Sequence, residues 1–170
     1  IRQMELDRLA GTENPIAAEH LVKTSLLLPA DPAVMERLTP LGELLAESLN
    51  SDDHSSYVAW RPLALALLEY RQDNFAAATD WLEKCAEYPG QQLAYVAATR
   101  TLRSMILARL GQREEAAAEL KAGKEMIEDQ FRKGPKLRDA ISGSMEGWLH
   151  ARILLREAEK LEHNPTKTAP

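Results

Sequence analysis

The chain has 170 residues, a net charge of −5 and a single cysteine; 45% of its residues are hydrophobic and 28% are charged. It is long enough for one folded domain with a real core and too apolar for wholesale disorder. Its acidic balance argues against nucleic-acid partners, which are normally met by a basic face. The longest apolar run is only a few residues, far short of the roughly 20 that cross a bilayer, so we expect no membrane insertion. The lone cysteine excludes an internal disulfide and fits a reducing, cytoplasmic location.

Leu, Ala and Glu dominate the chain, and apolar residues recur at helical spacing, so we expect an all-α fold. Asn14 and Asp31 each precede a proline, which places an N-cap before proline at the first helical position. Pro40 is expected to kink or divide the helix that contains it. After a short helical segment at 2–10, the predicted helices cover 15–28, 32–50, 57–71, 75–87, 93–110, 113–131 and 145–162, and 163–170 is expected to be a flexible tail.

Two stretches in the middle of the chain form an internal sequence repeat. The matched pairs, all at one constant offset along the chain, are Arg71 with Arg109, Asp73 with Gly111, Ala78 with Ala116, and Leu82 with Leu120. A repeated helix pair cannot bury its apolar face alone, so the spacing predicts a helical solenoid with hairpins over 57–88 and 93–131. We expect residues 1–162 to form a single domain.

The paired helices resemble tetratricopeptide repeats, in which small residues at fixed positions let the two helices of a hairpin pack closely. Small residues occupy such positions here at Ala66, Ala78, Gly111 and Ala116. The offset is longer than that of the family, which is usually about 34 residues. The pattern also departs from the family in Asp73 at the position of the turn glycine and in Ser104 at a small apolar position.

Three segments, 18–29, Tyr70–Arg71 and 148–161, together resemble the C-terminal tetratricopeptide-like region of large bacterial serine/threonine protein kinases and related WD-repeat proteins. The resemblance implies a tetratricopeptide-like solenoid of about seven helices with a capping helix at 145–162. It also implies an accessory, partner-binding segment. The motifs of a kinase are missing, so any kinase would lie upstream of Ile1.

The candidate binding surface is the inner face of the first helix of each hairpin. Some tetratricopeptide domains clamp a partner's terminal carboxylate there, but the equivalent positions are apolar in this chain, so we expect a groove for an amphipathic helix instead. The same residues could simply be core, which is the default at helical spacing. Arginines at the rim could meet acidic groups, or only solvate their helices. The candidate partner-binding residues are Trp60, Leu63, Leu67, Tyr70, Arg71, Arg100, Arg103, Met105 and Arg109.

The sequence shows no nucleophile with a base and no phosphate loop, so we expect neither an enzyme nor a cofactor. Residues 52–54 bring three potential metal ligands together without a distant fourth, so we expect no metal. Glu19 with His20, and Glu146 with His150, are interpreted as surface pairs. Cys85 is interpreted as a buried, inert packing residue.

The function expected from these patterns is a non-catalytic protein–protein interaction or scaffolding module of a larger bacterial signalling protein. Two alternatives remain open. The chain could sense a small ligand or a peptide, or it could mediate self-association or act as a spacer.

Overall fold

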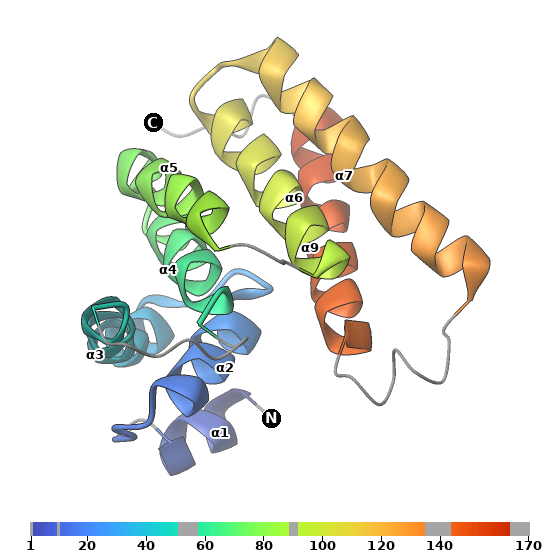
Figure 1. The fold of residues 1–170 in the computed structure, drawn as a ribbon. Helices are drawn as coiled ribbons and strands as arrows, with labels where there is room; N and C mark the ends of the chain where they lie inside the picture. The colour runs from blue at the N-terminus through green and yellow to red at the C-terminus, as the bar shows by residue number, and fades with distance from the viewer. Residues whose placement is uncertain (1, 10, 51–57, 89–91, 135–143, 164–170) are drawn as a thin grey trace. The chain divides into compact units, whose positions relative to one another are not determined.

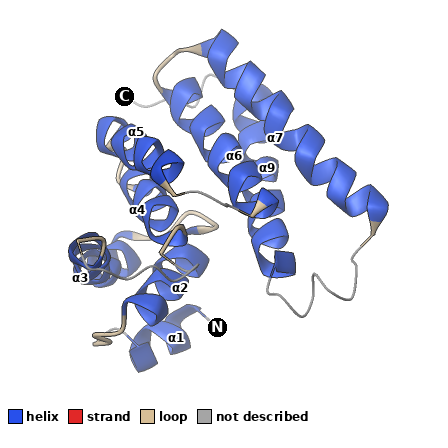
Figure 2. Ribbon diagram, in the orientation of Figure 1, coloured by secondary structure: helices blue, strands red, loops and turns tan. Residues whose placement is uncertain are grey.

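In a computed structural model, residues 2–9, 11–50, 58–88, 92–134 and 144–163 are described, and their regular structure is helical (Figures 1 and 2). No strand occurs among these residues, so the all-α prediction is confirmed for the described part of the chain. Two compact units make up the chain, Ile1–Tyr88 and Pro89–Pro170. Each unit is described by itself.

The N-terminal unit is a set of short helices in which α2 packs against both α3 and α4, and α4 packs against α5. Its elements are α1 (Arg2–Leu9), α2 (Pro15–Leu26), α3 (Pro32–Ser48), α4 (Trp60–Arg71), α5 (Phe75–Lys84) and the 3-10 turn η1 (Cys85–Glu87). Asn14 Oδ1 accepts a hydrogen bond from the Ile16 N–H at 2.9 Å, and Asp31 Oδ1 accepts one from the Val34 N–H at 2.9 Å. Both predicted N-caps are therefore confirmed.

Helix α3 runs without a break through Pro40, so Pro40 does not divide this segment. Proline removes a backbone donor and leaves the carbonyl one turn earlier without its helical partner. Pro40 lies on an exposed side of α3, where water can serve that carbonyl. On the buried side, Gly42 allows close packing against α4, because a Cβ atom there would lie 2.5 Å from Leu68 Cδ2.

The C-terminal unit contains three described helices, α6 (Leu93–Arg109), α7 (Arg113–Lys133) and α9 (Ser144–His163). Helix α6 packs against both α7 and α9 (Figure 1). The approach of α7 to α6 depends on Gly123, where a Cβ atom would lie 2.9 Å from Thr101 Oγ1. Apolar side chains of all three helices, including Leu102, Ile127 and Leu154, form the core of this unit.

The same turn joins α4 to α5 and α6 to α7. After α4, the Asn74 N–H donates to the Glu69 carbonyl at 2.9 Å and the Asp73 N–H donates to the Tyr70 carbonyl at 3.2 Å. The second residue after the helix cap bonds back five residues and the first bonds back three, which is the Schellman motif of helix ends. It requires a left-handed residue, and Asp73 has φ of 58°.

After α6, the Gln112 N–H donates to the Leu107 carbonyl at 2.9 Å and the Gly111 N–H donates to the Ala108 carbonyl at 3.2 Å. Gly111 has φ of 79° and is the residue that matches Asp73 in the sequence repeat. The repeat read from the sequence is therefore a repeat of backbone structure at the turn. Its arrangement into a solenoid stays a prediction.

Helix ends agree with the predicted ends to within a few residues, and α1 is the short segment expected before the seven longer helices. All but the first residue of the tail expected at 163–170 lies outside the described residues, as do segments 51–57 and 135–143.

Candidate functional site

The apolar members of the predicted binding set are buried. Trp60, Leu63, Leu67 and Tyr70 line α4 with at most 8% exposure, and Met105 of α6 is 0% exposed. Buried aliphatic and aromatic side chains at helical spacing are core residues. In this structure these five side chains therefore pack the interior, so a partner protein would have to bind other residues.

Arg71 ends α4 and reaches back to the end of α2. Its Nε donates to the Leu26 carbonyl at 3.0 Å, and its Nη2 donates to the Leu27 carbonyl at 3.3 Å. The last carbonyls of a helix have no partner within the helix, and a cation at that end also interacts favourably with the helix dipole. Arg71 thus holds α2 against α4, and its guanidinium is occupied by an intramolecular task.

Two of the remaining arginines lie on one side of α6, where Arg100 is exposed and Arg103 is half-buried. Arg100 and Arg103 belong to a stripe at alternating spacings of three and four residues, turned away from the buried side of the helix. We call this stripe the α6 face, and its members are Leu93, Val96, Arg100, Arg103, Leu107 and Leu110.

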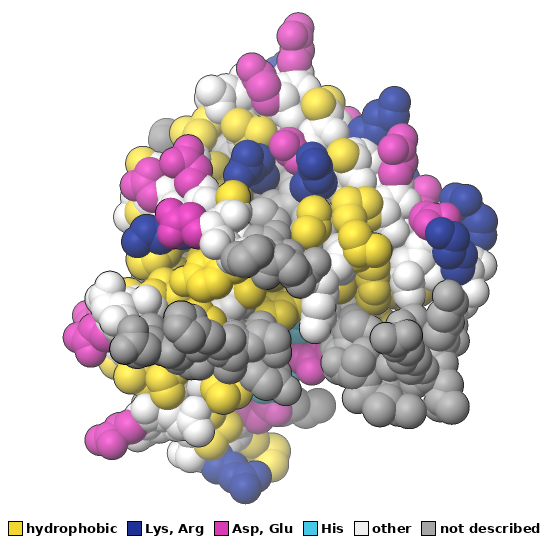
Figure 3. Space-filling view, viewed as in Figure 1, with side chains coloured by type: hydrophobic (Ala, Val, Ile, Leu, Met, Phe, Trp, Pro, Cys, Tyr) yellow, Lys and Arg dark blue, Asp and Glu magenta, His cyan; other side chains and the backbone are white. Residues whose placement is uncertain are grey.

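Both ends of the α6 face are apolar and exposed. Leu93 is 66% exposed and Leu110 is 48% exposed, while Val96 and Leu107 are half-buried. Together with Val96 and Leu107, the two exposed leucines give the stripe an apolar character at both ends, which makes it a candidate contact surface. The space-filling view shows hydrophobic side chains gathered beside basic ones over α6 and α7 (Figure 3).

One side of α7 borders the α6 face. Arg100 Nη1 donates to Glu119 Oε2 of α7 at 2.9 Å, which places Glu119 beside the stripe. Ala122 and Met126 follow Glu119 at helical spacing and are half-buried. The α6 face therefore continues onto an apolar edge of α7.

Arg109 lies elsewhere on α6 and lines a cleft of about 330 Å³ among α6, α7 and α9. Small and apolar side chains, such as Ala108, Ala117 and Leu161, form much of its wall. Arg113 and Glu162 add charge to the lining. The volume lies at the lower end of the range of about 300–1,000 Å³ typical of ligand pockets.

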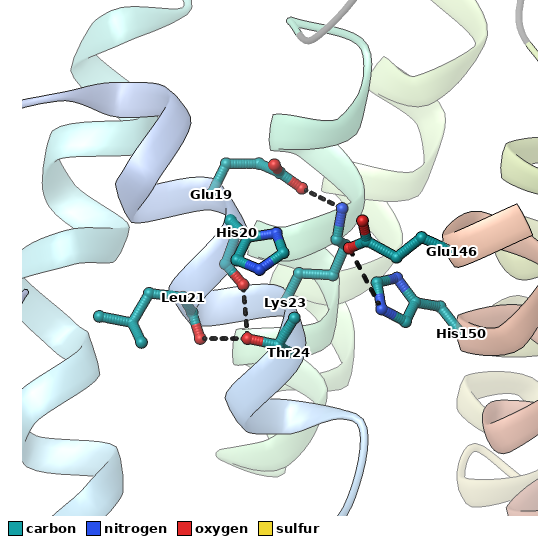
Figure 4. A network of polar contacts seen from close by, with 7 residues as sticks. All are labelled: Glu19, His20, Leu21, Lys23, Thr24, Glu146 and His150. Atoms are coloured by element: carbon teal, nitrogen blue, oxygen red, sulfur yellow. Dashed lines mark hydrogen bonds and ion pairs between the residues drawn. The ribbon is translucent and has the colours of Figure 1, made fainter. Parts of the chain in front are cut away.

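One residue from each of the two pairs interpreted as surface features, Glu19 and His150, is buried. Figure 4 shows both residues with their neighbours. In the N-terminal unit, Glu19 is 4% exposed and its carboxylate lies 2.8 Å from Lys23 Nζ. In the C-terminal unit, His150 is 6% exposed and its Nε2 lies 3.5 Å from Glu146 Oε1. The surface interpretation is wrong for Glu19 and for His150, although the pairing of His150 with Glu146 is present.

Sequence reasoning missed the role of Lys23. Besides meeting Glu19, Lys23 Nζ lies 4.5 Å from the centroid of the Trp60 ring, a cation–π contact between α2 and α4. Glutamate four residues before lysine on one helix was the available signal. The contact with Trp60 had no sequence signal, since the two residues lie on different helices far apart along the chain.

Cys85 is 2% exposed, and its Sγ donates to the Trp81 carbonyl at 3.4 Å. This is the buried packing thiol that the sequence predicts. Nearby, burial raises the pKa of Tyr88, with the charge of Glu87 as a second cause and Arg61 opposing both.

Groups of three or more metal-ligating side chains are absent from the described ranges. The 52–54 cluster considered from the sequence lies outside those ranges. In the part of the chain that the structure covers, each helix is too short or too polar to cross a bilayer.

No protein-family model, no curated protein and no solved structure matches this chain.

Proposed function

We propose that this chain is a non-catalytic protein-interaction or scaffolding module built from tetratricopeptide-like hairpins. The observation that carries the proposal is the turn made twice, with matching backbone hydrogen bonds at Asp73 and at Gly111. Repeated helix pairs are an architecture whose extended surfaces bind other proteins. The α6 face supports a binding role, because it leaves a large leucine exposed at each of its two ends.

The wider setting of the proposal comes from the resemblance to C-terminal regions of bacterial kinases and WD-repeat proteins. On that basis the chain acts in the cytoplasm as part of a larger signalling protein. Its mechanism is equilibrium binding that brings a partner to the rest of that protein. The interior position of Trp60, Leu63, Leu67, Tyr70 and Met105 moves the expected contact surface to the α6 face.

In vivo photo-crosslinking tests the proposal even though the partner is unidentified. A photoreactive benzoylphenylalanine replaces Leu110 at the end of the α6 face, or, as a matched control, Met4 of α1, which is also exposed. We expect a heterologous protein to crosslink from position 110 and not from position 4. Crosslinks only between copies of the chain would support self-association, and no crosslink at all would support a spacer.

A second function, the sensing of a small ligand, is favoured by the cleft among α6, α7 and α9. Its apolar wall with charges from Arg109, Arg113 and Glu162 suits a small aliphatic molecule that carries a charged group. Ala117→Trp should fill the cleft while it leaves the α6 face unchanged. If a small-molecule cell extract raises the melting temperature of the chain and still does so after this change, sensing through the cleft is refuted.

A further inference from the structure

We infer that the α6 face binds an acidic amphipathic helix of a partner protein. The inference rests on the proposed function and names the chemistry of the partner at that surface.

The shape of the α6 face suits a helix. Its members recur at alternating spacings of three and four residues from Leu93 to Leu110, so they form one continuous stripe that winds slowly around the helix. At a rise of 1.5 Å per residue, the stripe is roughly 25 Å long. A partner helix of about five turns would cover it, with apolar residues at helical spacing against the leucines. Ala122 and Met126 of α7 border the surface on which this helix would lie.

The charge in the middle of the stripe selects an acidic partner. Arg103 has no ion-pair partner within the described ranges. Arg100 pairs with Glu119, but side-chain exposures of 44% and 23% make this a solvent-exposed pair of small net value. Both guanidiniums can therefore take partner carboxylates, and arginine binds carboxylates with two parallel hydrogen bonds.

A second copy of the chain does not suit this surface. In a twofold-symmetric contact between two antiparallel α6 helices centred on the stripe, Arg100 of one copy would lie against Arg103 of the other. In a parallel contact, each arginine would lie against its own equivalent. Both arrangements place like charges together at the centre of the interface, which costs affinity. The complementary occupant is a helix of opposite charge.

The test uses the whole chain and two synthetic peptides, each about 18 residues long so that its helix makes five turns. Both peptides carry leucines at positions i, i+4, i+7 and i+11; one has glutamates beside the leucines and the other has lysines at those positions. Fluorescence anisotropy measures their affinities at low and high salt. We expect the acidic peptide to bind at least about tenfold more tightly than the basic one, and its affinity to fall as salt rises.

Charge reversal assigns the contact to the α6 face. Arg103→Glu should weaken the acidic peptide at least about tenfold and invert the preference toward the basic peptide. Lys121→Glu makes the same change of charge at an exposed position on the other side of α7 and should alter neither affinity more than about twofold. Arg103→Gln, which keeps a polar side chain, should give an intermediate affinity for the acidic peptide. Circular dichroism confirms that each variant is folded.

The inference is overturned if neither peptide binds, if both bind equally well, or if Lys121→Glu has the effect of Arg103→Glu. It is also overturned if sedimentation shows a dimer that Leu93→Glu dissociates, since the face would then be occupied by a second copy. A heterologous crosslink from position 110 together with any of these results would leave the binding module intact and remove only the acidic helix. If position 110 gives no heterologous crosslink, the proposed function itself is refuted.

Discussion

The close approach of α6 and α7 makes a prediction about Gly123. A methyl group at this position would meet Thr101 Oγ1 at 2.9 Å, closer than packed atoms sit. Thr101 is 0% exposed, and its hydroxyl donates to the Ala97 carbonyl at 2.8 Å, so it has little room to move. Gly123→Ala should therefore push the two helices apart or force Thr101 into another rotamer.

The size of the effect follows from two opposing contributions. Overpacking a filled interior costs about 1–3 kcal/mol, and replacing glycine by alanine inside a helix gains about 1 kcal/mol. We expect Gly123→Ala to lower the free energy of unfolding by about 1 kcal/mol. Thr101→Ala removes the atom that the new methyl group meets. In the double variant, the penalty at position 123 should vanish and the gain in helix propensity should remain.

Native-state hydrogen exchange of the α6 and α7 amides is the assay, because it reports the unit that carries the changes even where the whole chain does not unfold in one step. The double-mutant cycle should show a favourable coupling of about 1–2 kcal/mol between the substitutions at positions 123 and 101. Additivity within about 0.4 kcal/mol would show that Gly123 does not set the helix spacing. Gly11→Ala serves as a control that should leave this exchange unchanged, since a Cβ atom there meets nothing within 4 Å.

Three further predictions concern single positions. Arg71→Met should lower the free energy of unfolding by about 1–2 kcal/mol, measured in urea, because two helix-end carbonyls lose a charged donor; a loss below about 0.3 kcal/mol would contradict the capping role. Asp73→Gly should stabilise the chain by about 0.5–1 kcal/mol and Gly111→Asp should destabilise it by a similar amount, because both residues have positive φ; effects of the same sign in thermal melts would refute the shared turn. Burial raises the pKa of Tyr88 above its unfolded value of 10.0, so its contribution to stability is present below that pH and is lost as pH rises through the folded pKa. Tyr88→Phe should therefore unfold with less dependence on pH between about 9 and 11. An unchanged dependence would be the contrary result.

Local features of the fold could be predicted from the sequence because a few neighbouring residues determine them. Asn14 and Asp31 act as N-caps through their own side chains, and the turns at Asp73 and Gly111 depend on hydrogen bonds that span at most six residues. The constant offset between the two turns was visible for the same reason. Such features need no information about how distant helices pack.

The candidate site was harder to predict because it depends on which side of each helix is covered. Leu67 and Met105 have the spacing of a groove and the spacing of a core, and only their burial decides between the two. Arg71 resembled a rim arginine, since its partners at the end of α2 are backbone carbonyls that have no sequence signature. The exposed ends of the α6 face, Leu93 and Leu110, gave no signal that separates them from buried leucines.

The bond between Arg71 and the end of α2 also has a consequence for the order of folding. The Schellman turns close within six residues, so each hairpin can form quickly from local contacts. The Arg71 guanidinium must instead find carbonyls 44 and 45 residues back in the chain, and closing that loop costs entropy before it gains a hydrogen bond. Its formation should mark the late step in which the first helices dock onto a hairpin that is already made.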